Sequence, residues 1–169
     1  SPRHFACIAS LNCDSGKTCD TWGWIFPSSA QRQTCSSRAV RIDGSLAVEI
    51  AVGSSEKTVK IISASDGKVD RIIRGLSSPV HCLSLSPDYK LLAGGCADNS
   101  IIIWSLSTGK EQIRLNEHTD RLKFVAFSSD NKTLASGSLD NTAKLWDAQT
   151  GKYLHPLTGH THYVMSGSF

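Results

Sequence analysis

A repeat of 42 residues runs through this chain of 169 residues and limits what it can fold into. At this offset the same kinds of residue recur without a gap: Ile62, Trp104 and Trp146; Gly53, Gly95 and Gly137; Val80, Leu122 and Val164. A Gly-Lys pair follows each member of the first series, at 67–68, 109–110 and 151–152. A fixed period of this length is typical of architectures in which copies of one small unit stack on one another.

Each repeat unit has the pattern of short strands joined by turns. Residues 79–85 alternate apolar and polar side chains, which is the period of a half-buried strand, and a turn cluster follows at 86–89. Two more apolar segments end at Gly95 and Trp104, and a fourth segment covers 110–115. This pattern leaves no room for a helix. Because a single four-stranded sheet is not stable alone, we expect the units to cover one another's faces.

The unit resembles the WD40 repeat, which carries a Gly-His pair near one end and Trp-Asp at the other. Gly159-His160 and Trp146-Asp147 match this pattern, and Glu117-His118 and Trp104-Ser105 are altered copies. The resemblance covers residues 39–169. It implies an all-β fold, namely a partial WD40 β-propeller of about three four-stranded antiparallel blades plus one extra strand, arranged as an open arc.

The resemblance also divides the chain into blades. The expected blades are residues 39–75, 76–117 and 118–159, and a further blade is expected to start within 160–169. Because propellers have ~4–8 blades, this number implies a fragment of a larger propeller protein. Residues 1–38 do not follow the repeat, and we leave open whether they are a degenerate blade or a Cys-containing segment unrelated to the fold.

Six cysteines raise the questions of disulfides and of a metal site. A zinc site could be built from His4, Cys7, Cys13 and Cys19. Zinc ligand pairs usually lie two to four residues apart, and the five-residue gaps between these cysteines do not fit, so we predict no metal. No signal-like apolar segment supports secretion and disulfides, which favours an intracellular location, cytoplasmic or nuclear. Cys82 and Cys96 lie in apolar segments and are predicted to be small buried hydrophobes.

The resemblance further implies a structural hydrogen-bond network within one blade. Its members in this chain are His118, Ser136, Asp140 and Trp146. Asp140 would accept from the imidazole of His118, while Ser136 would meet both the imidazole and the indole N–H of Trp146. The preceding unit has Leu76 and Gly94 at the His and Ser positions, so we expect it to rely on apolar packing.

His118, Asp140 and Ser136 are also the residue types of a hydrolase triad. Their spacing repeats with the blade, and the chain has no Gly-x-Ser-x-Gly elbow that would expose a nucleophile. We therefore predict that the three residues are structural, that the protein is not an enzyme and that it needs no cofactor.

The function that the resemblance implies is a scaffold for protein–protein assembly, with other proteins or peptides and the missing blades of the parent propeller as partners. Binding residues in that family often lie in the loop entering a blade's first strand and just before the turn Asp. The matching positions here are Arg121, Tyr163, Asp120, His162, Leu139 and Ala97, with Ser55 and Ser78 besides. Arg121 and Tyr163 are the preferred candidates because Arg and Tyr are favoured interface anchors. The alternative for Arg121 is a simple pairing with Asp120 or solvent.

A different class of function remains open, in which the repeats are the regulatory or sensor region of a larger multidomain ATPase or kinase. Nucleic acid and membranes are disfavoured as partners by charge. Residues 39–169 hold 14 basic and 13 acidic side chains, and no two Lys or Arg are adjacent there. The chain also has no apolar run near the ~20 residues of a membrane helix.

Overall fold

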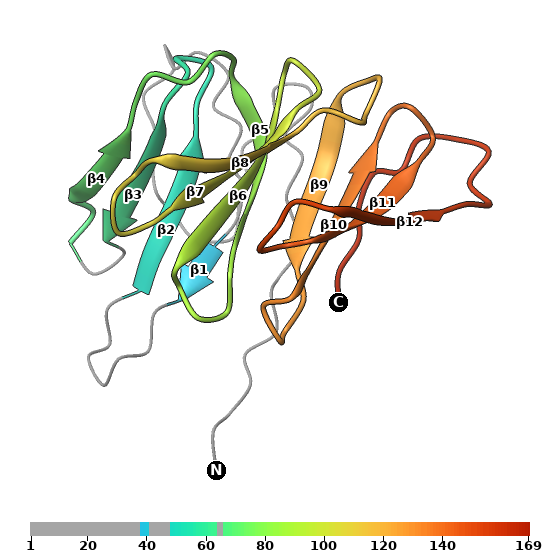
Figure 1. Ribbon diagram of the computed structural model, residues 1–169. Coiled ribbons are helices and arrows are strands. Elements are labelled where there is room, and N and C mark those ends of the chain that lie inside the picture. The colour runs from blue at the N-terminus through green and yellow to red at the C-terminus, as the bar shows by residue number, and fades with distance from the viewer. Residues whose placement is uncertain (1–37, 41–47, 64–65) are drawn as a thin grey trace.

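Twelve strands in three four-stranded sheets make up the described part of the computed structural model, which comprises residues 38–40, 48–63 and 66–169 (Figure 1). The first sheet contains β1 (Arg38–Val40), β2 (Val48–Gly53), β3 (Val59–Ser63) and β4 (Val69–Ile73). The second contains β5 (Val80–Leu85), β6 (Leu91–Cys96), β7 (Ile101–Ser105) and β8 (Glu111–Leu115). The third contains β9 (Leu122–Phe127), β10 (Thr133–Ser138), β11 (Ala143–Asp147) and β12 (Tyr153–Leu157).

Within each sheet the strands follow one another in chain order, and the paired strands are antiparallel. The sheets stand side by side as an open arc, so the predicted all-β, partial-propeller class is confirmed (Figure 1). The described residues contain no helix of the length and apolarity that crossing a bilayer requires. The predictions made for residues 1–37, including the zinc alternative, lie outside the described residues.

One predicted element is missing at the C-terminal end. We expected an extra strand within 160–169, but β12 is the last strand and no strand follows it. A strand needs hydrogen-bond partners on at least one side, and the segment makes one such backbone bond, from Val164 N to Ser138 O at 3.1 Å. Val164 is nevertheless buried, in a cluster with Phe124 and Ala143 of the third sheet.

The tight turns repeat with the same 42-residue period as the strands. Non-glycine residues with positive φ occupy equivalent turn positions at Lys57, Asn99 and Asn141. The Gly-Lys turns place Gly67, Gly109 and Gly151 at φ between 67° and 73°. At Gly151 a side chain would be doubly unfavourable, because a Cβ there would also lie 2.5 Å from a methyl carbon of Ile113.

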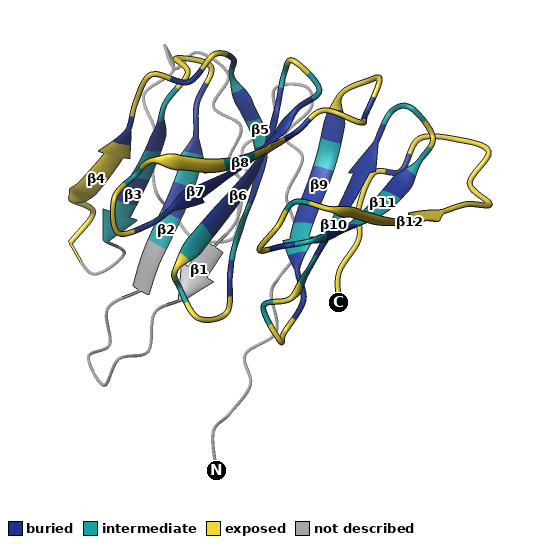
Figure 2. Cartoon of the chain, viewed as in Figure 1, coloured by how far each residue is buried: buried dark blue, intermediate teal, exposed yellow. Residues whose placement is uncertain are grey.

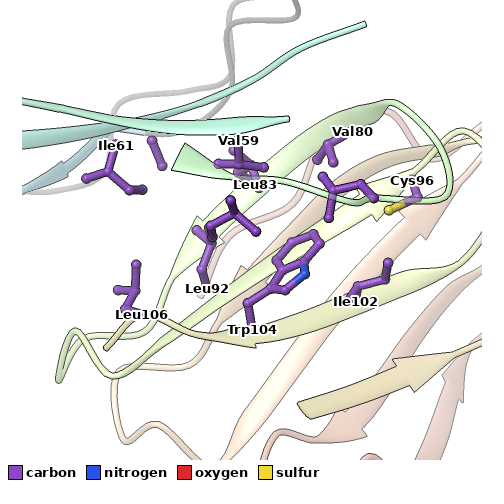
Figure 3. Packing of buried hydrophobic residues seen from close by; sticks show 12 residues of the cluster. Val59, Ile61, Val80, Leu83, Leu92, Cys96, Ile102, Trp104 and Leu106 are labelled. Atoms are coloured by element: carbon purple, nitrogen blue, oxygen red, sulfur yellow. The ribbon is translucent and has the colours of Figure 1, made fainter. Parts of the chain in front are cut away.

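Two apolar cores hold the three sheets together, and each core lies between neighbouring sheets. The first packs Val59 and Ile61 of β3 against Leu92 and Trp104 of the second sheet (Figure 3). The second packs residues of the second sheet, among them Ile103, against the third sheet. Figure 2 shows the corresponding gradient, since β6 and β7 are mostly buried, while β4 and β12 are exposed strands at the rim. Each sheet therefore shelters a face of its neighbour.

Three glycines at the 42-residue spacing set how closely the sheets approach. A Cβ at Gly95 would lie 2.7 Å from Cβ of Leu122, the first residue of the next sheet, and 2.6 Å from Sγ of Cys82. Gly53 stands in the same relation to Val80, and Gly137 to Val164. The absence of a side chain at this position lets Val80, Leu122 or Val164 of the following unit lie directly against the backbone of β2, β6 or β10.

Candidate functional site

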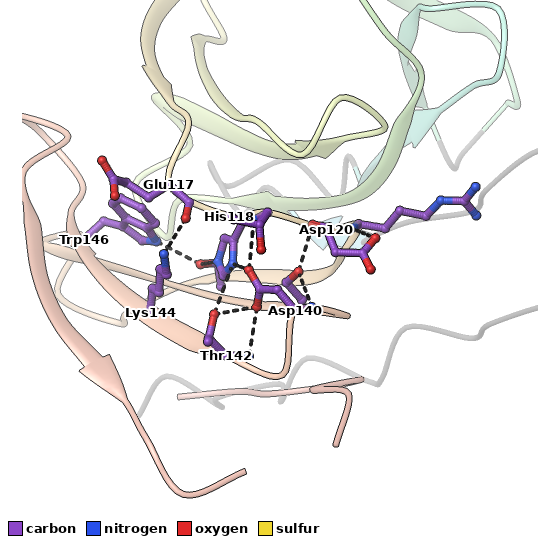
Figure 4. A network of polar contacts seen from close by, with 11 residues as sticks. Glu117, His118, Asp120, Asp140, Thr142, Lys144 and Trp146 are labelled. Atoms are coloured by element: carbon purple, nitrogen blue, oxygen red, sulfur yellow. Dashed lines mark hydrogen bonds and ion pairs between the residues drawn. The ribbon is translucent and has the colours of Figure 1, made fainter. Parts of the chain in front are cut away.

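The best-connected polar cluster of the described residues lies in the third sheet (Figure 4). His118 precedes β9, Ser136 lies on β10, Asp140 lies in the β10–β11 turn and Trp146 lies on β11. His118 Nδ1 is 2.7 Å from Oδ2 of Asp140, and its Nε2 is 2.8 Å from Oγ of Ser136. The indole nitrogen of Trp146 donates to the same Oγ at 2.9 Å. The structure thus brings all four residues into one chain of hydrogen bonds.

The direction of each bond in this chain follows from the charge of Asp140. A carboxylate can only accept, so His118 Nδ1 carries the proton and Nε2 accepts from the hydroxyl of Ser136. That hydroxyl oxygen then remains free to accept from Trp146. Asp140 is held further by the backbone N–H groups of Thr119 at 3.1 Å and Thr142 at 2.9 Å. Every polar side-chain atom of this four-residue network has a partner, a condition under which a buried network fixes one packing.

Burial and hydrogen bonding set the protonation states of the network. Burial lowers the pKa of His118 below its usual 6.5, and this outweighs the opposing effect of Asp140, so the imidazole is neutral at pH 7. Burial alone would raise the pKa of Asp140, but hydrogen bonds from Thr142, His118 and Thr119 outweigh it and lower the pKa to about 2. The pair is therefore a neutral imidazole that donates to a carboxylate.

This geometry has the residue types of a hydrolase triad but not the access. Ser136 is 0% exposed and His118 is 5% exposed, and the serine oxygen already accepts the indole N–H. A nucleophile must reach a substrate, and no substrate atom can approach this hydroxyl without displacing Trp146. The cluster instead ties the loop before β9 to the β10–β11 turn and to the core tryptophan.

The second sheet packs its core tryptophan without this hydrogen-bond network. Leu76 and Gly94 stand where His118 and Ser136 stand one repeat later, and a Cβ at Gly94 would lie 2.6 Å from the ring of Trp104. The tryptophan ring thus occupies the space of the missing serine side chain. Asp98 still organises its turn, accepting from Ser100 N at 3.1 Å and Ser77 Oγ at 3.2 Å. Arg114, an arginine without a counterpart in the third sheet, lies 3.7 Å from the same carboxylate.

As pH falls, protonation of His118 is expected to destabilise the fold at a higher pH than protonation of any carboxylate does. Because the pKa of His118 is lower in the fold than in the unfolded chain, its contribution to stability is complete above about pH 6.5 and is lost as pH falls below that. Asp140, with a pKa of about 2, contributes to acid unfolding only below about pH 4.

Thermal melts between pH 8 and pH 5 check this expectation. The wild type should show a falling Tm, and His118→Gln should start from a lower Tm but decline less over the same range. His81→Gln is the necessary comparison, because burial, followed by Arg121 and Lys123, also lowers the pKa of His81. Equal declines in the wild type and His118→Gln would contradict the assignment.

The predicted partner-binding residues lie at one end of the sheets. Asp120 and Arg121 precede β9 and are exposed, and Arg121 O accepts from Leu139 N at 2.9 Å in the β10–β11 turn. Ala97 makes the equivalent bond to Pro79 in the second sheet at 2.8 Å. His162 and Tyr163, both exposed, directly precede Val164. Of the two additional positions, Ser55 is exposed, whereas Ser78 is buried and cannot present its side chain to a partner.

Two residues at this sheet end escaped the sequence reasoning. His81 of β5 and Lys123 of β9 are skipped in the strand register, since Val80 pairs with Cys96 and Cys82 with Gly95, and the same shift recurs in β9. A bulge of this kind re-aims the extra side chain. The only sequence signal was that the two residues are 42 positions apart.

The two described cysteines and the acidic side chains offer no alternative chemistry. Burial raises the pKa of the Cys82 thiol to about 12 and that of Cys96 to about 11, so both stay protonated and unreactive. Within the described residues, no three His, Cys, Asp or Glu side chains are placed to hold a metal ion.

Comparisons with known proteins agree with this architecture. The family model described as "WD domain, G-beta repeat" matches residues 67–105 and 109–147. No curated protein matches the chain. Similar solved structures are U3-55K and the RRP9 WD40 repeats, each 27% identical with a TM-score of 0.68 over 78% of this chain, and a chain of the Mitotic Checkpoint Complex, 26% identical with a TM-score of 0.65 over 76%. This chain covers 40% of the length of the first two and 38% of the third.

Proposed function

Because this chain belongs to the WD40-repeat family, we propose that it is a non-catalytic scaffold that binds other proteins or peptides at the sheet end carrying Arg121 and Tyr163. The observation that carries the proposal is the gathering of six candidate positions at one end of rigid sheets. Loops and turns held by a stable scaffold are the usual place for recognition.

The chemistry of this sheet end suits a protein partner. Arg121 is exposed and Tyr163 is 63% exposed, and these two residue types dominate binding energy at interfaces. The turns beneath them are fixed, since Ser138 Oγ donates to Asp120 O at 2.8 Å and accepts from Asp140 N at 3.0 Å. A fixed binding surface loses little conformational entropy when a partner docks. One similar chain was solved within an assembly, the Mitotic Checkpoint Complex.

A second kind of partner is suggested by the outer face of the third sheet. Phe124, Ala143 and Val164 form a small cluster there, and Tyr163, Met165 and Phe169 nearby in the chain are exposed. Since the opposite face of this sheet is covered by the second sheet, we infer that further blades of the same propeller cover this one.

Exchanging the two anchors tests the scaffold proposal. Arg121→Glu and Tyr163→Ala are each expected to reduce several-fold the amount of the proteins that the wild type captures from a cell extract, measured by quantitative mass spectrometry. Lys110→Glu, an exposed residue beside β8 in a turn of the other sheet end, is the charge-matched control and should leave capture unchanged. Equal capture by all four proteins would remove this surface from the proposal.

A further inference from the structure

Two β-bulges at equivalent places expose a histidine and a lysine on neighbouring strands. His81 and Lys123 are the extra residues of the bulges in β5 and β9, and these two strands are neighbours at the contact between the second and third sheets. Both side chains are partly exposed, although their strand neighbours Cys82 and Leu122 are buried. The bulges thus expose two side chains within strands whose other side chains build the core.

Arg121 adds a second permanent cation to this group. Arg121 lies two residues before Lys123, and, after burial, the positive charges of both lower the pKa of His81, as expected of cations within electrostatic range. Within the described part of the chain, neither Arg121 nor Lys123 takes part in an ion pair. The carboxylates of the two nearby turns already have partners, since Arg114 and Ser100 hold Asp98, and His118 and Thr142 hold Asp140.

The acid that adjoins Arg121 in the sequence does not neutralise this group. Asp120 is exposed, and its Oδ1 accepts the backbone N–H of Arg121 at 2.6 Å, so the carboxylate is turned to the backbone. One carboxylate stands against two permanent cations and a histidine. The local charge therefore stays positive, although the charges of the repeats as a whole nearly balance.

Apolar residues flank the basic group at the same repeat positions. Pro79, Arg121 and Tyr163 are 42 residues apart, as are His81, Lys123 and Met165. Tyr163 is 63% exposed and Met165 is 43% exposed. Both residues flank Val164, whose backbone N–H donates to Ser138 O at 3.1 Å, so this exposed pair lies at the sheet end where β10 ends. An isolated anion would use only the charges, whereas a peptide can use the apolar ends as well.

We propose that His81, Arg121 and Lys123 bind an acidic peptide segment through its Asp or Glu carboxylates, with apolar residues of the same segment resting on Tyr163 and Met165. The proposal rests on the proposed function and names the chemistry of the partner at that surface. Arg121 supplies a planar fork for a carboxylate and Lys123 supplies a compact charge. Such pairs steer association and fix specificity, and salt weakens them where they are exposed.

Fluorescence anisotropy with the full chain tests the proposal. The probe is a labelled twelve-residue peptide in which Glu alternates with Ser and a Leu stands near one end, and the control probe has Gln at every Glu. The wild type should bind the Glu peptide at least about tenfold more tightly than the Gln peptide in 50 mM salt, and this preference should shrink in 500 mM salt as charges are screened. Equal binding of both peptides, or binding of neither, would overturn the proposal.

Variants assign the binding to the two cations, Arg121 and Lys123. Arg121→Glu and Lys123→Glu should each weaken binding of the Glu peptide about tenfold, and the milder Arg121→Gln and Lys123→Gln about threefold. Lys110→Glu makes the same change in net charge at the other sheet end and should leave the affinity within about twofold. An equal loss in Lys110→Glu would show an effect of net charge alone and would overturn the assignment. Circular dichroism and thermal melts identify any variant that fails to fold. If a Glu variant fails to fold, the affinity of the Gln variant at the same position tests the assignment.

The outcome separates this inference from the proposed function. If Tyr163→Ala loses captured proteins while the wild type shows no preference for the Glu peptide, the sheet end is an interaction surface for a partner of other chemistry. If the Glu peptide binds through Arg121 and Lys123, both the surface and the chemistry of its partner are supported.

Discussion

Replacing Ser136 by alanine is expected to lower the free energy of unfolding by about 2–4 kcal/mol. The side chain is fully buried and hydrogen-bonds both the imidazole of His118 and the indole of Trp146. Its removal leaves a buried N–H donor and a buried nitrogen acceptor without partners, and each such group costs about 1–3 kcal/mol. Equilibrium urea unfolding followed by tryptophan fluorescence measures the change.

A matched serine exchange provides the reference. Ser129 is an exposed residue of the β9–β10 turn, and Ser129→Ala should stay within about 0.5 kcal/mol of the wild type. If Ser136→Ala unfolded at the same urea concentration as Ser129→Ala, the network would contribute little to the fold, and the structural interpretation of His118, Asp140 and Trp146 would lose its basis.

Gly95→Ala is expected to destabilise the protein by about 3 kcal/mol, although it adds a single methyl group. The new Cβ would lie 2.6 Å from Sγ of Cys82 and 2.7 Å from Cβ of Leu122, where real contacts need well over 3 Å. The strain acts between the second and third sheets, so the chain must separate these sheets or shift β9. Urea unfolding again gives the magnitude.

Alanine substitutions at the equivalent glycines are expected to destabilise the protein by different amounts. At Gly53 the nearest atoms to a new Cβ are the carbonyl oxygen of Val80 at 3.0 Å and its Cβ at 3.2 Å, so Gly53→Ala should cost less than Gly95→Ala. Combining Gly95→Ala with Cys82→Ala should cost less than the sum of the two single changes, because the second change removes the Sγ atom that would lie 2.6 Å from the new Cβ. Additive costs would place the strain elsewhere.

The fold could be predicted from the sequence because the same turn and core positions recur every 42 residues. Residues such as Gly95, Asp98 and Trp104 occupy the same turn or core position in each unit, so three weak local patterns reinforce one another. The predicted segment 79–85 differs from β5 only at its first residue. The extra strand expected at 160–169 is absent, because the start of a further repeat does not supply the neighbouring strand that hydrogen bonding requires.

Part of the candidate site could also be predicted from the sequence, and part could not. The positions of His118, Ser136, Asp140 and Trp146 follow from the repeat, and the structure brings them together. The bulges at His81 and Lys123 do not follow from it, because a register shift depends on pairing between strands and leaves no mark in composition. The link between Arg114 and Asp98 was missed for a related reason, since Arg114 has no counterpart in the next unit.

The central claim is that consecutive 42-residue units pack side by side, with Val80, Leu122 and Val164 each resting on a glycine of the unit before it. Nuclear Overhauser effects between the α-protons of Gly95 and the side-chain protons of Leu122 test this contact directly. We expect strong cross-peaks for this pair and for Gly53 with Val80 and Gly137 with Val164, because the structure places these side chains against the glycine backbone. Sharp, assigned resonances for Gly95 and Leu122 without any cross-peak between them would contradict the packing of the sheets and everything inferred from it.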